Sequence, residues 1–251
     1  MNINNISLSS ISRENNVEEQ KLQDVKHILS SEDKLKSERI SESYSYLLNN
    51  STLNPKVVWN GVIKPIYLIQ FNDYTQQSWR SASGTAFEYF LATYYQKRLP
   101  SNYRINKHGA KSKQKAVQSL GLENEISKEK IDLTIEYNKN GEWTIIGCPH
   151  VKTSLRERIS DLRSASKILI ENNIFSPILT LDSQSELGKS DDKQANLGRD
   201  LVENQGVFSN MYCYNTSAEP TTRKNAKSKI KIIDLPSKSD EFITDIMSLK
   251  L

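Results

Sequence analysis

The chain has 251 residues, of which 36% are hydrophobic and 25% are charged. This length suits one sizeable domain with at most a small appendage, and the composition excludes wholesale disorder. No apolar run approaches the roughly 18–20 residues that cross a membrane, and the N-terminus lacks the features of a secretory signal. Cys148 and Cys213 form no CxxC pair, which argues against structural zinc. We therefore expect a cytoplasmic protein with no membrane partner.

The net charge of +4 is a mild indication of a polyanionic partner. Its distribution is more informative, because basic side chains gather in two clusters. The first consists of Lys107, His108, Lys111, Lys113 and Lys115, and the second of Arg223, Lys224, Lys227, Lys229 and Lys231. Each cluster is either a solvated loop or a set of phosphate contacts that would make binding sensitive to salt.

Residues 1–60 are predicted to form a helical appendage. Apolar residues recur at helical spacing over residues 13–48, on either side of a Ser-Ser-Glu-Asp break. Proline and glycine mark residues 51–65 as a connector. Residues 74–98 form a long helix, and Pro100 ends it.

The rest of the chain alternates strands with helices. Residues 131–137 alternate apolar and polar side chains, and the Asn-Lys-Asn-Gly turn that follows predicts a hairpin with a strand over 143–151. Residues 155–172 have the pattern of an amphipathic helix. Further strands are predicted over 175–181, 207–214 and 230–235, with a last helix over 241–249. The order predicts an α/β domain in which a mixed central β-sheet is flanked by helices.

Two residues of the predicted hairpin carry chemistry. Asp132 lies near the start of its first strand and Lys152 at the end of its second. Antiparallel strands joined by a short turn bring such positions together at one edge of the sheet. A carboxylate there can hold Mg²⁺, which prefers oxygen ligands. A lysine beside it can orient or deprotonate the attacking water and neutralise phosphate charge.

A strand aspartate, a hairpin, a strand-end lysine and then a helix together resemble the core of the PD-(D/E)XK nucleases, over roughly residues 78–182. The resemblance implies a restriction-endonuclease-like core over residues 61–251, with Mg²⁺ as the cofactor. It also implies that Asp132 and Glu88 bind the metal and that Lys152 is catalytic. Glu88 ends the Ser-Gly-Thr-Ala-Phe-Glu segment of the preceding helix, where the superfamily often has a metal-binding glutamate.

The chain departs from the superfamily pattern two residues before Lys152. An acid is usual there, but the residue is His150, and imidazole is a poor ligand for Mg²⁺. In similar nucleases this acid has moved to the following helix, at a position that falls here near Ala165 and Ser166. Asp161, one turn earlier, is the alternative to Glu88 as the second metal ligand. His150 lies in the core, supports a metal ligand from behind, or touches the phosphate.

The run Lys-Thr-Ser-Leu-Arg-Glu-Arg at residues 152–158 resembles the type II restriction endonucleases that read CC:GG sequences. In those enzymes the arginines and the acid recognise bases. Arginine pairs with guanine through O6 and N7, and a carboxylate accepts from the N4 amine of cytosine. Arg156, Glu157 and Arg158 would accordingly read two consecutive G·C pairs. The alternative is a capping box of Ser154 and Glu157 with solvent-facing arginines.

The resemblance implies a Mg²⁺-dependent type II restriction endonuclease that cuts double-stranded DNA at a palindromic site with a CCGG-type core. A homodimer would present two sets of base-reading residues to such a site. A cognate DNA methyltransferase would act on the same site without having to bind the nuclease. The alternatives are a structure-specific repair nuclease and a non-catalytic DNA-binding protein, which the substitution of His150 for the usual acid keeps open.

Overall fold

The computed structural model describes residues 7–70, 76–155, 159–185, 187, 195–236 and 240–249. The chain forms two compact units, Met1–Phe90 with Asp234–Pro236, and Leu91–Ile233 with Ser237–Leu251. The division falls inside helix α6 (Gln76–Gln96). The domain boundary expected near residue 60 stays a prediction. No helix in the described part of the chain is both long and apolar enough to span a membrane.

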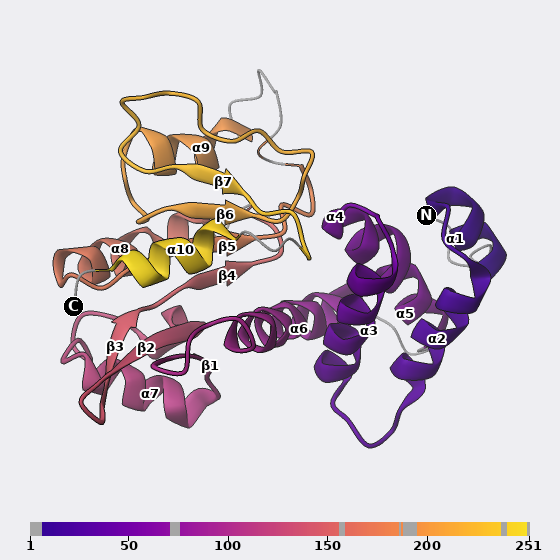
Figure 1. The fold of residues 1–251 in the computed structure, drawn as a ribbon, viewed down its shortest axis with the longest axis horizontal. Coiled ribbons are helices and arrows are strands. Elements are labelled where there is room, and N and C mark those ends of the chain that lie inside the picture. The colour runs from indigo at the N-terminus through magenta and orange to yellow at the C-terminus, as the bar shows by residue number, and fades with distance from the viewer. Residues whose placement is uncertain are drawn as a thin grey trace. The chain divides into compact units, whose positions relative to one another are not determined.

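The first unit is helical, as predicted. Its elements are α1 (Leu8–Asn15), α2 (Glu19–Ser30), α3 (Lys36–Asn50), α4 (Pro55–Val57), the π-helical segment η2 (Val58–Ile63), α5 (Lys64–Gln70) and the first part of α6 (Figure 1). The connector predicted over residues 51–65 is wrong. Asn54 caps α4 by accepting from the N–H of Lys56 at 2.9 Å, and Pro55 occupies the first helical position, where its missing N–H costs nothing.

Aromatic side chains hold the first unit together. Tyr44 of α3 packs edge-on against Trp59 of η2, with ring centroids 4.8 Å apart, and against Phe90 of α6 at 4.7 Å. Phe87 lies 5.6 Å from Trp59. All four side chains are almost entirely buried. The helices of this unit therefore share one aromatic core, to which each large ring contributes both buried area and edge-to-face attraction.

The second unit is the predicted α/β domain, with antiparallel and parallel strands. β1 (Tyr103–Lys107), β2 (Leu133–Lys139) and β3 (Glu142–Gly147) form an antiparallel sheet in the order β1-β2-β3. β4 (His150–Lys152), β5 (Ile178–Thr180), β6 (Met211–Cys213) and β7 (Ile230–Ile232) form a parallel sheet in chain order. An isolated parallel bridge from Gly147 to Phe175 joins the two sets of strands.

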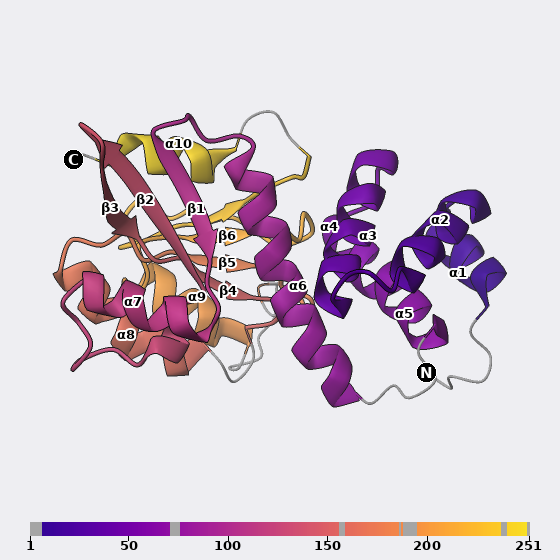
Figure 2. The same cartoon turned by 90° about the horizontal axis from the view of Figure 1, so that it is seen from below.

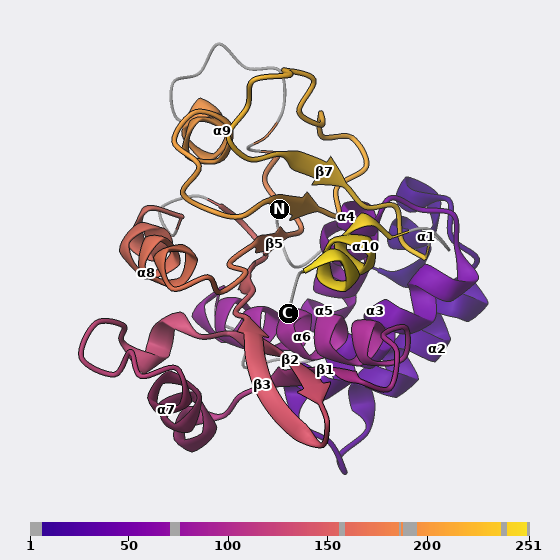
Figure 3. The same ribbon diagram turned by 60° about the vertical axis from the view of Figure 1, so that its left-hand side comes forward.

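Helices cover both faces of the parallel sheet. Figure 3 shows α8 (Ile159–Glu171) and α9 (Ala195–Glu203) on one side and α10 (Glu241–Ser248) on the other. Met211 and Cys213 point to the first side, where they join the core beneath α8 and α9. Tyr212 points the opposite way, and its ring lies 4.9 Å from that of Phe242 in α10. Alternation along one buried strand thus supplies two separate packing faces.

The predicted strand over residues 143–151 is in fact two strands. β3 ends at Gly147, and after Cys148 and Pro149 the chain continues as β4 in the parallel sheet. The backbone pairing changes at this point, because the N–H of Cys148 donates to Phe175 O at 2.8 Å. Proline has no N–H to donate to a ladder, so residue 149 is a natural place for the pairing to break. The uninterrupted apolar character of the segment concealed this break.

Four described elements of the second unit were not predicted, namely β1, α7 (Ala110–Ser119), the short 3-10 helix η3 (Lys128–Lys130) and α9. Strand β1 and helix α7 lie in and around the first basic cluster, which was expected to be a solvated loop or a set of phosphate contacts. In Figure 2, α7 lies near the hairpin of β2 and β3. Ala116 and Val117 of α7 are buried in a core with Cys148 and Leu169. A short apolar face was therefore enough to fix this helix.

A substitution at Gly147 tests how closely the chain packs where the two sheets meet. A β-carbon there would lie 3.1 Å from Phe175 O and 3.2 Å from Ile135 Cδ1, which is too close for an unshifted structure. We expect Gly147→Ala to lower the free energy of unfolding by about 1–3 kcal/mol, the usual cost of overpacking. Urea denaturation measures the change. Gly84→Ala is the control, because a β-carbon meets nothing within 4 Å in the middle of α6. It should be neutral or stabilise by about 1 kcal/mol, and equal effects of both substitutions would contradict the argument.

Candidate active site

The structure brings Asp132 and Lys152 together. Lys152 Nζ donates to Asp132 Oδ2 at 2.7 Å, and the backbone N–H of Val151 donates to the same oxygen at 2.9 Å. The Asp132 side chain is 7% exposed and that of Lys152 is 14% exposed. A carboxylate that has lost most of its water is stabilised only by such charged and backbone donors. The pair is therefore a fixed feature of the fold.

The elements that create this pair differ from those expected. Asp132 directly precedes β2, in the antiparallel sheet, whereas Lys152 ends β4, in the parallel sheet. The two residues are not opposite each other in a hairpin, since β2 pairs with β3 and β4 pairs with β5. The change of sheet at Cys148 and Pro149 carries the chain back past the start of β2, where the N–H of Leu133 faces Pro149 O at 3.4 Å.

A second lysine faces the same carboxylate. Lys113 Nζ of α7 lies 3.8 Å from Asp132 Oδ1, and its side chain is 19% exposed. This distance is an ion-pair contact and is too long for a hydrogen bond. The two oxygens of Asp132 are thus served differently, since Oδ2 has two close donors and Oδ1 has a more distant cation. In the sequence Lys113 is one member of a basic cluster, and its contact with Asp132 was not predicted.

His150 is entirely buried and lies behind the pair. Its Nδ1 lies 3.1 Å from Lys130 O and its Nε2 lies 3.1 Å from Ser176 Oγ. Burial lowers the pKa of His150 to about 4, opposed by the charge of Asp132 and by the hydrogen bond to the Lys130 backbone, whereas the charge of Lys152 adds to the lowering. The ring is consequently neutral at pH 7, donates to the Lys130 carbonyl and accepts from Ser176. Of the three roles expected for His150, its complete burial agrees with a place in the core.

Ser166 extends this buried chain. Its Oγ lies 2.8 Å from Ser176 Oγ, and both side chains are fully buried. His150 occupies the usual position of the acid in the superfamily pattern, and Ser166 is one of the two residues near its alternative position. Both are neutral here, and Ser176 connects them. Among the described residues, the interior beside Lys152 is therefore satisfied by neutral hydrogen bonds and supplies no second carboxylate.

The remaining predicted site residues lie on α6, on α8 or outside the described residues. Glu88 lies half-buried on α6, in the first compact unit. Asp161 is exposed in the first turn of α8. Arg156, Glu157 and Arg158 fall outside the described residues, directly before α8. Ser154, the other half of the expected capping box, is described and half-buried.

Asp132 fits a magnesium ion as one ligand of several. Within the described residues, no group of three or more His, Cys, Asp or Glu side chains comes together as in a preformed metal site. Mg²⁺ commonly uses only one or two protein carboxylates and takes water and substrate phosphate for the rest. Asp132 Oδ1, which is free of close hydrogen-bond donors in the described structure, is the oxygen suited to this role.

A row of polar residues continues from Asp132 along one face of β2. Thr134 Oγ1 lies 2.6 Å from His108 Nε2, and Glu136 pairs with Arg104 across to β1. Burial is the main factor that lowers the pKa of His108, and the neighbouring lysines add to it. Asp132 is the member of this row that meets Lys152. Thr134 and Glu136 are paired with residues on β1 or directly after it.

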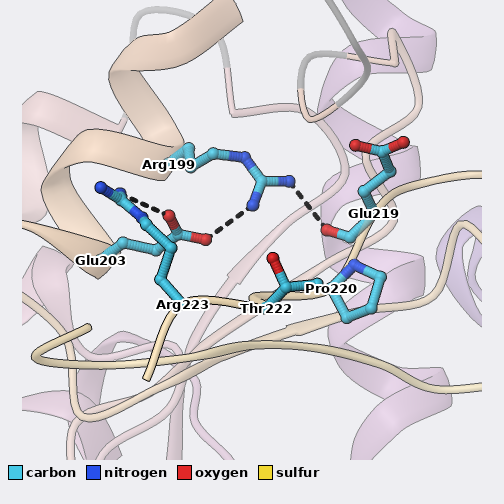
Figure 4. Close-up of a pocket in the computed structure, with 6 residues that line it drawn as sticks. All are labelled: Arg199, Glu203, Glu219, Pro220, Thr222 and Arg223. Carbon is cyan, nitrogen blue, oxygen red and sulfur yellow. Dashed lines mark hydrogen bonds and ion pairs between the residues drawn. The ribbon is translucent and has the colours of Figure 1, made fainter. Parts of the chain in front are cut away.

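A second charged cluster lies at α9, where Glu203 is 3% exposed between two arginines (Figure 4). Arg199 Nη1 lies 2.6 Å from its Oε1 and Arg223 Nη2 lies 2.8 Å from its Oε2. Thr221 also donates to Glu203, at 2.7 Å. These contacts fasten the segment before β7 to α9. Arg223 of the second basic cluster is therefore engaged within the protein, whereas Lys224, Lys227 and Lys229 are exposed.

Comparison with known proteins places these observations in a family. A family model described as "BsaWI restriction endonuclease type 2" matches residues 108–237. The type II restriction enzyme AgeI of Thalassovita gelatinovora is 28% identical over 225 residues, which cover 79% of this chain and 78% of that enzyme. The matched family segment contains Lys113, Asp132, His150 and Lys152.

Two solved structures resemble the fold. The restriction endonuclease AgeI in a specific DNA complex has a TM-score of 0.81 at 24% identity, over 93% of both chains. BsaWI in a pre-specific DNA complex has a TM-score of 0.52 at 18% identity, over 97% of this chain and 91% of that one. The predicted α/β fold is thereby confirmed as one that restriction endonucleases have.

The neutral state of His150 makes stability depend on pH. Its pKa falls from the usual 6.5 to about 4 on folding, so the unfolded chain binds a proton that the folded chain does not bind between these values. Stability is complete above about pH 6.5 and declines as the pH falls towards 4. Between pH 7 and pH 5 we expect His150 to account for a loss of about 2 kcal/mol.

Urea denaturation of the wild type and of His150→Gln at both pH values measures this contribution. The variant should be less stable at pH 7, because the glutamine does not reproduce the contacts with Lys130 and Ser176, but it should lose less on acidification. An equal loss in both proteins would show that His150 is not the group responsible.

Proposed function

Since the chain belongs to the BsaWI family of type II restriction endonucleases, we propose that it hydrolyses double-stranded DNA with Mg²⁺ at a palindromic site with a CCGG-type core. The observation that supports this most directly is the buried pair of Asp132 and Lys152. A carboxylate and a lysine 2.7 Å apart, within the segment that the family model matches, provide a metal ligand and a cation beside one another.

The proposed roles follow from the chemistry of the two groups. Asp132 and Glu88 bind the metal, and Lys152 positions or deprotonates the attacking water. A bound Mg²⁺ would neutralise charge on the reacting phosphate and lower the pKa of its water. Lys152 is already held at the carboxylate, so its ammonium is oriented before DNA arrives. Its second hydrogen bond, to Val151 O at 2.9 Å, limits its freedom further.

Base recognition is proposed for Arg156, Glu157 and Arg158. These residues lie between β4, which carries Lys152, and α8. A short segment thus joins the proposed catalytic lysine to the proposed readers, which would fix the distance between the cut and the recognised bases. The arginines suit guanine and the glutamate suits cytosine in the major groove.

A homodimer is proposed because a palindromic site presents the same bases twice. The helical N-terminal unit would support dimerisation or embrace the DNA. A cognate methyltransferase would protect the same sequence in the host. A cytoplasmic location remains a prediction, with which the two buried cysteines, Cys148 and Cys213, agree, because neither forms a disulfide.

Incubation of the purified protein with unmethylated phage DNA and Mg²⁺, followed by gel electrophoresis, tests the function. We expect discrete bands that EDTA abolishes, with CCGG-type sequences at the fragment ends. Lys152→Ala should lower the cleavage rate at least about a hundredfold, the lower range for removal of a general base. Lys167→Ala changes an exposed lysine of α8 and should cut at the wild-type rate.

Two outcomes would contradict the proposal. Cleavage by Lys152→Ala at the wild-type rate would remove the lysine from the mechanism. DNA left intact by the wild type in both Mg²⁺ and Mn²⁺ would favour a non-catalytic DNA-binding protein. Cleavage that follows DNA structure and gives no defined fragments would favour a repair nuclease.

A second prediction concerns recognition. Removal of one bidentate arginine costs about 1–3 kcal/mol of discrimination, or roughly five- to a hundredfold. We expect Arg158→Ala to lose this factor in the preference for a CCGG duplex over one with a changed G·C pair, as measured by competition binding. Arg163→Ala replaces an exposed arginine of α8 and should keep the preference. Unchanged preference in Arg158→Ala would favour the capping-box alternative.

A further inference from the structure

The two oxygens of Asp132 are held by different lysines. Oδ2 receives close hydrogen bonds from Lys152 Nζ and from the backbone of Val151. Oδ1 faces Lys113 Nζ at 3.8 Å, at the ion-pair distance. The oxygen suited to a metal is therefore the one that Lys113 faces. A divalent cation and the Lys113 ammonium would compete for it, because two positive groups repel each other at that distance.

The fold directs Lys113 towards this oxygen. Lys113, Ala116 and Val117 lie three and four residues apart, and so they share one face of α7. Ala116 and Val117 are buried in the core with Cys148, which lies next to β4. Lys111 and Lys115 are exposed on the other side of the helix. The packing of α7 thus selects one lysine out of three and aims it at Asp132.

The position of Lys113 also has an electrostatic cost. It lies near the N-terminus of α7, where the helix dipole disfavours positive charge, and no acid lies in the first turn to offset it. Gly109 provides no side-chain cap. The compensating negative charges nearby come from Asp132 and, through space, from Glu129. The Asp132 carboxylate is consequently the main partner that makes this placement favourable.

We propose that Lys113 is a positioning residue whose ammonium pairs with Asp132 Oδ1 and keeps a metal ion from this oxygen until DNA is bound. This proposal rests on the proposed function. Lys113 must leave this oxygen before the carboxylate can bind a divalent cation. A DNA phosphate arriving at the site offers the ammonium a new partner. Its departure then exposes Oδ1 while Lys152 and Val151 keep Oδ2 in place. Metal loading is in this way linked to DNA binding through one side chain.

The test is Mn²⁺ binding in the absence of DNA, measured as the rise in melting temperature of the protein as the ion is added. Lys113→Met keeps the length of the side chain and removes its charge. We expect the variant to reach half of the maximal stabilisation at a Mn²⁺ concentration at least about fivefold lower than the wild type. This is roughly the factor that one unit charge about 4 Å from another produces in water. Lys115→Met, on the exposed side of α7, should behave as the wild type.

Two further variants make the result specific. Asp132→Asn should abolish the Mn²⁺ effect, which assigns the ion to this carboxylate. Lys113→Gln should repeat the result of Lys113→Met with a side chain that remains polar, so that a folding defect of one variant does not decide the outcome. Equal Mn²⁺ midpoints for Lys113→Met and Lys115→Met, or an effect that survives Asp132→Asn, would overturn the proposal.

The DNA half of the proposal has its own readout. If Lys113 moves to a phosphate, Lys113→Met should reduce the salt dependence of metal-free DNA binding by about one phosphate contact relative to the wild type. An unchanged slope would overturn this half. These measurements involve no cleavage, so a protein that fails to cut DNA would refute the proposed function while the Mn²⁺ titration still decides the role of Lys113.

Discussion

The arrangement of the second unit depends on the hydrogen bonds that the buried carboxylate of Asp132 accepts from Val151 and Lys152. These bonds tie the start of β2 in the antiparallel sheet to β4 in the parallel sheet. Loss of one partner of such a pair leaves an uncompensated buried charge, which typically costs about 3–5 kcal/mol. The same contact therefore fixes the fold and holds the two proposed catalytic groups in register.

The interior next to this pair explains how the chain departs from the PD-(D/E)XK pattern. Ser166 donates to Ser176, Ser176 to His150, and His150 to the carbonyl of Lys130, so each buried polar group has a partner. An acid at position 150 would have to ionise where burial already lowers the pKa of a histidine to about 4. A neutral chain avoids that cost. The second acid is accordingly expected from outside this interior.

Much of the fold could be read from the sequence, because alternation marked β2 and the Asn-Lys-Asn-Gly turn marked its hairpin with β3. The break at Cys148 and Pro149 could not, because the apolar residues around it suit a buried strand whether or not it is continuous. The proximity of Asp132 and Lys152 was predicted from a single hairpin, whereas it depends on the change of sheet at Cys148 and Pro149. Lys113 was hidden among other lysines, although its spacing from Ala116 and Val117 could have identified its buried face.

Charge balance gives the last constraint on the site. Asp132 contributes one negative charge, and Lys113 and Lys152 contribute two positive charges close to it. A divalent cation added to this set would leave several positive charges in a largely buried place, and such an excess is strongly unfavourable. Two sources of negative charge can correct it, namely a further protein carboxylate, proposed as Glu88 with Asp161 as its alternative, and the phosphates of the DNA. The described site alone is thus better prepared for a polyanion than for a free metal ion, and DNA and metal should bind more tightly together than apart.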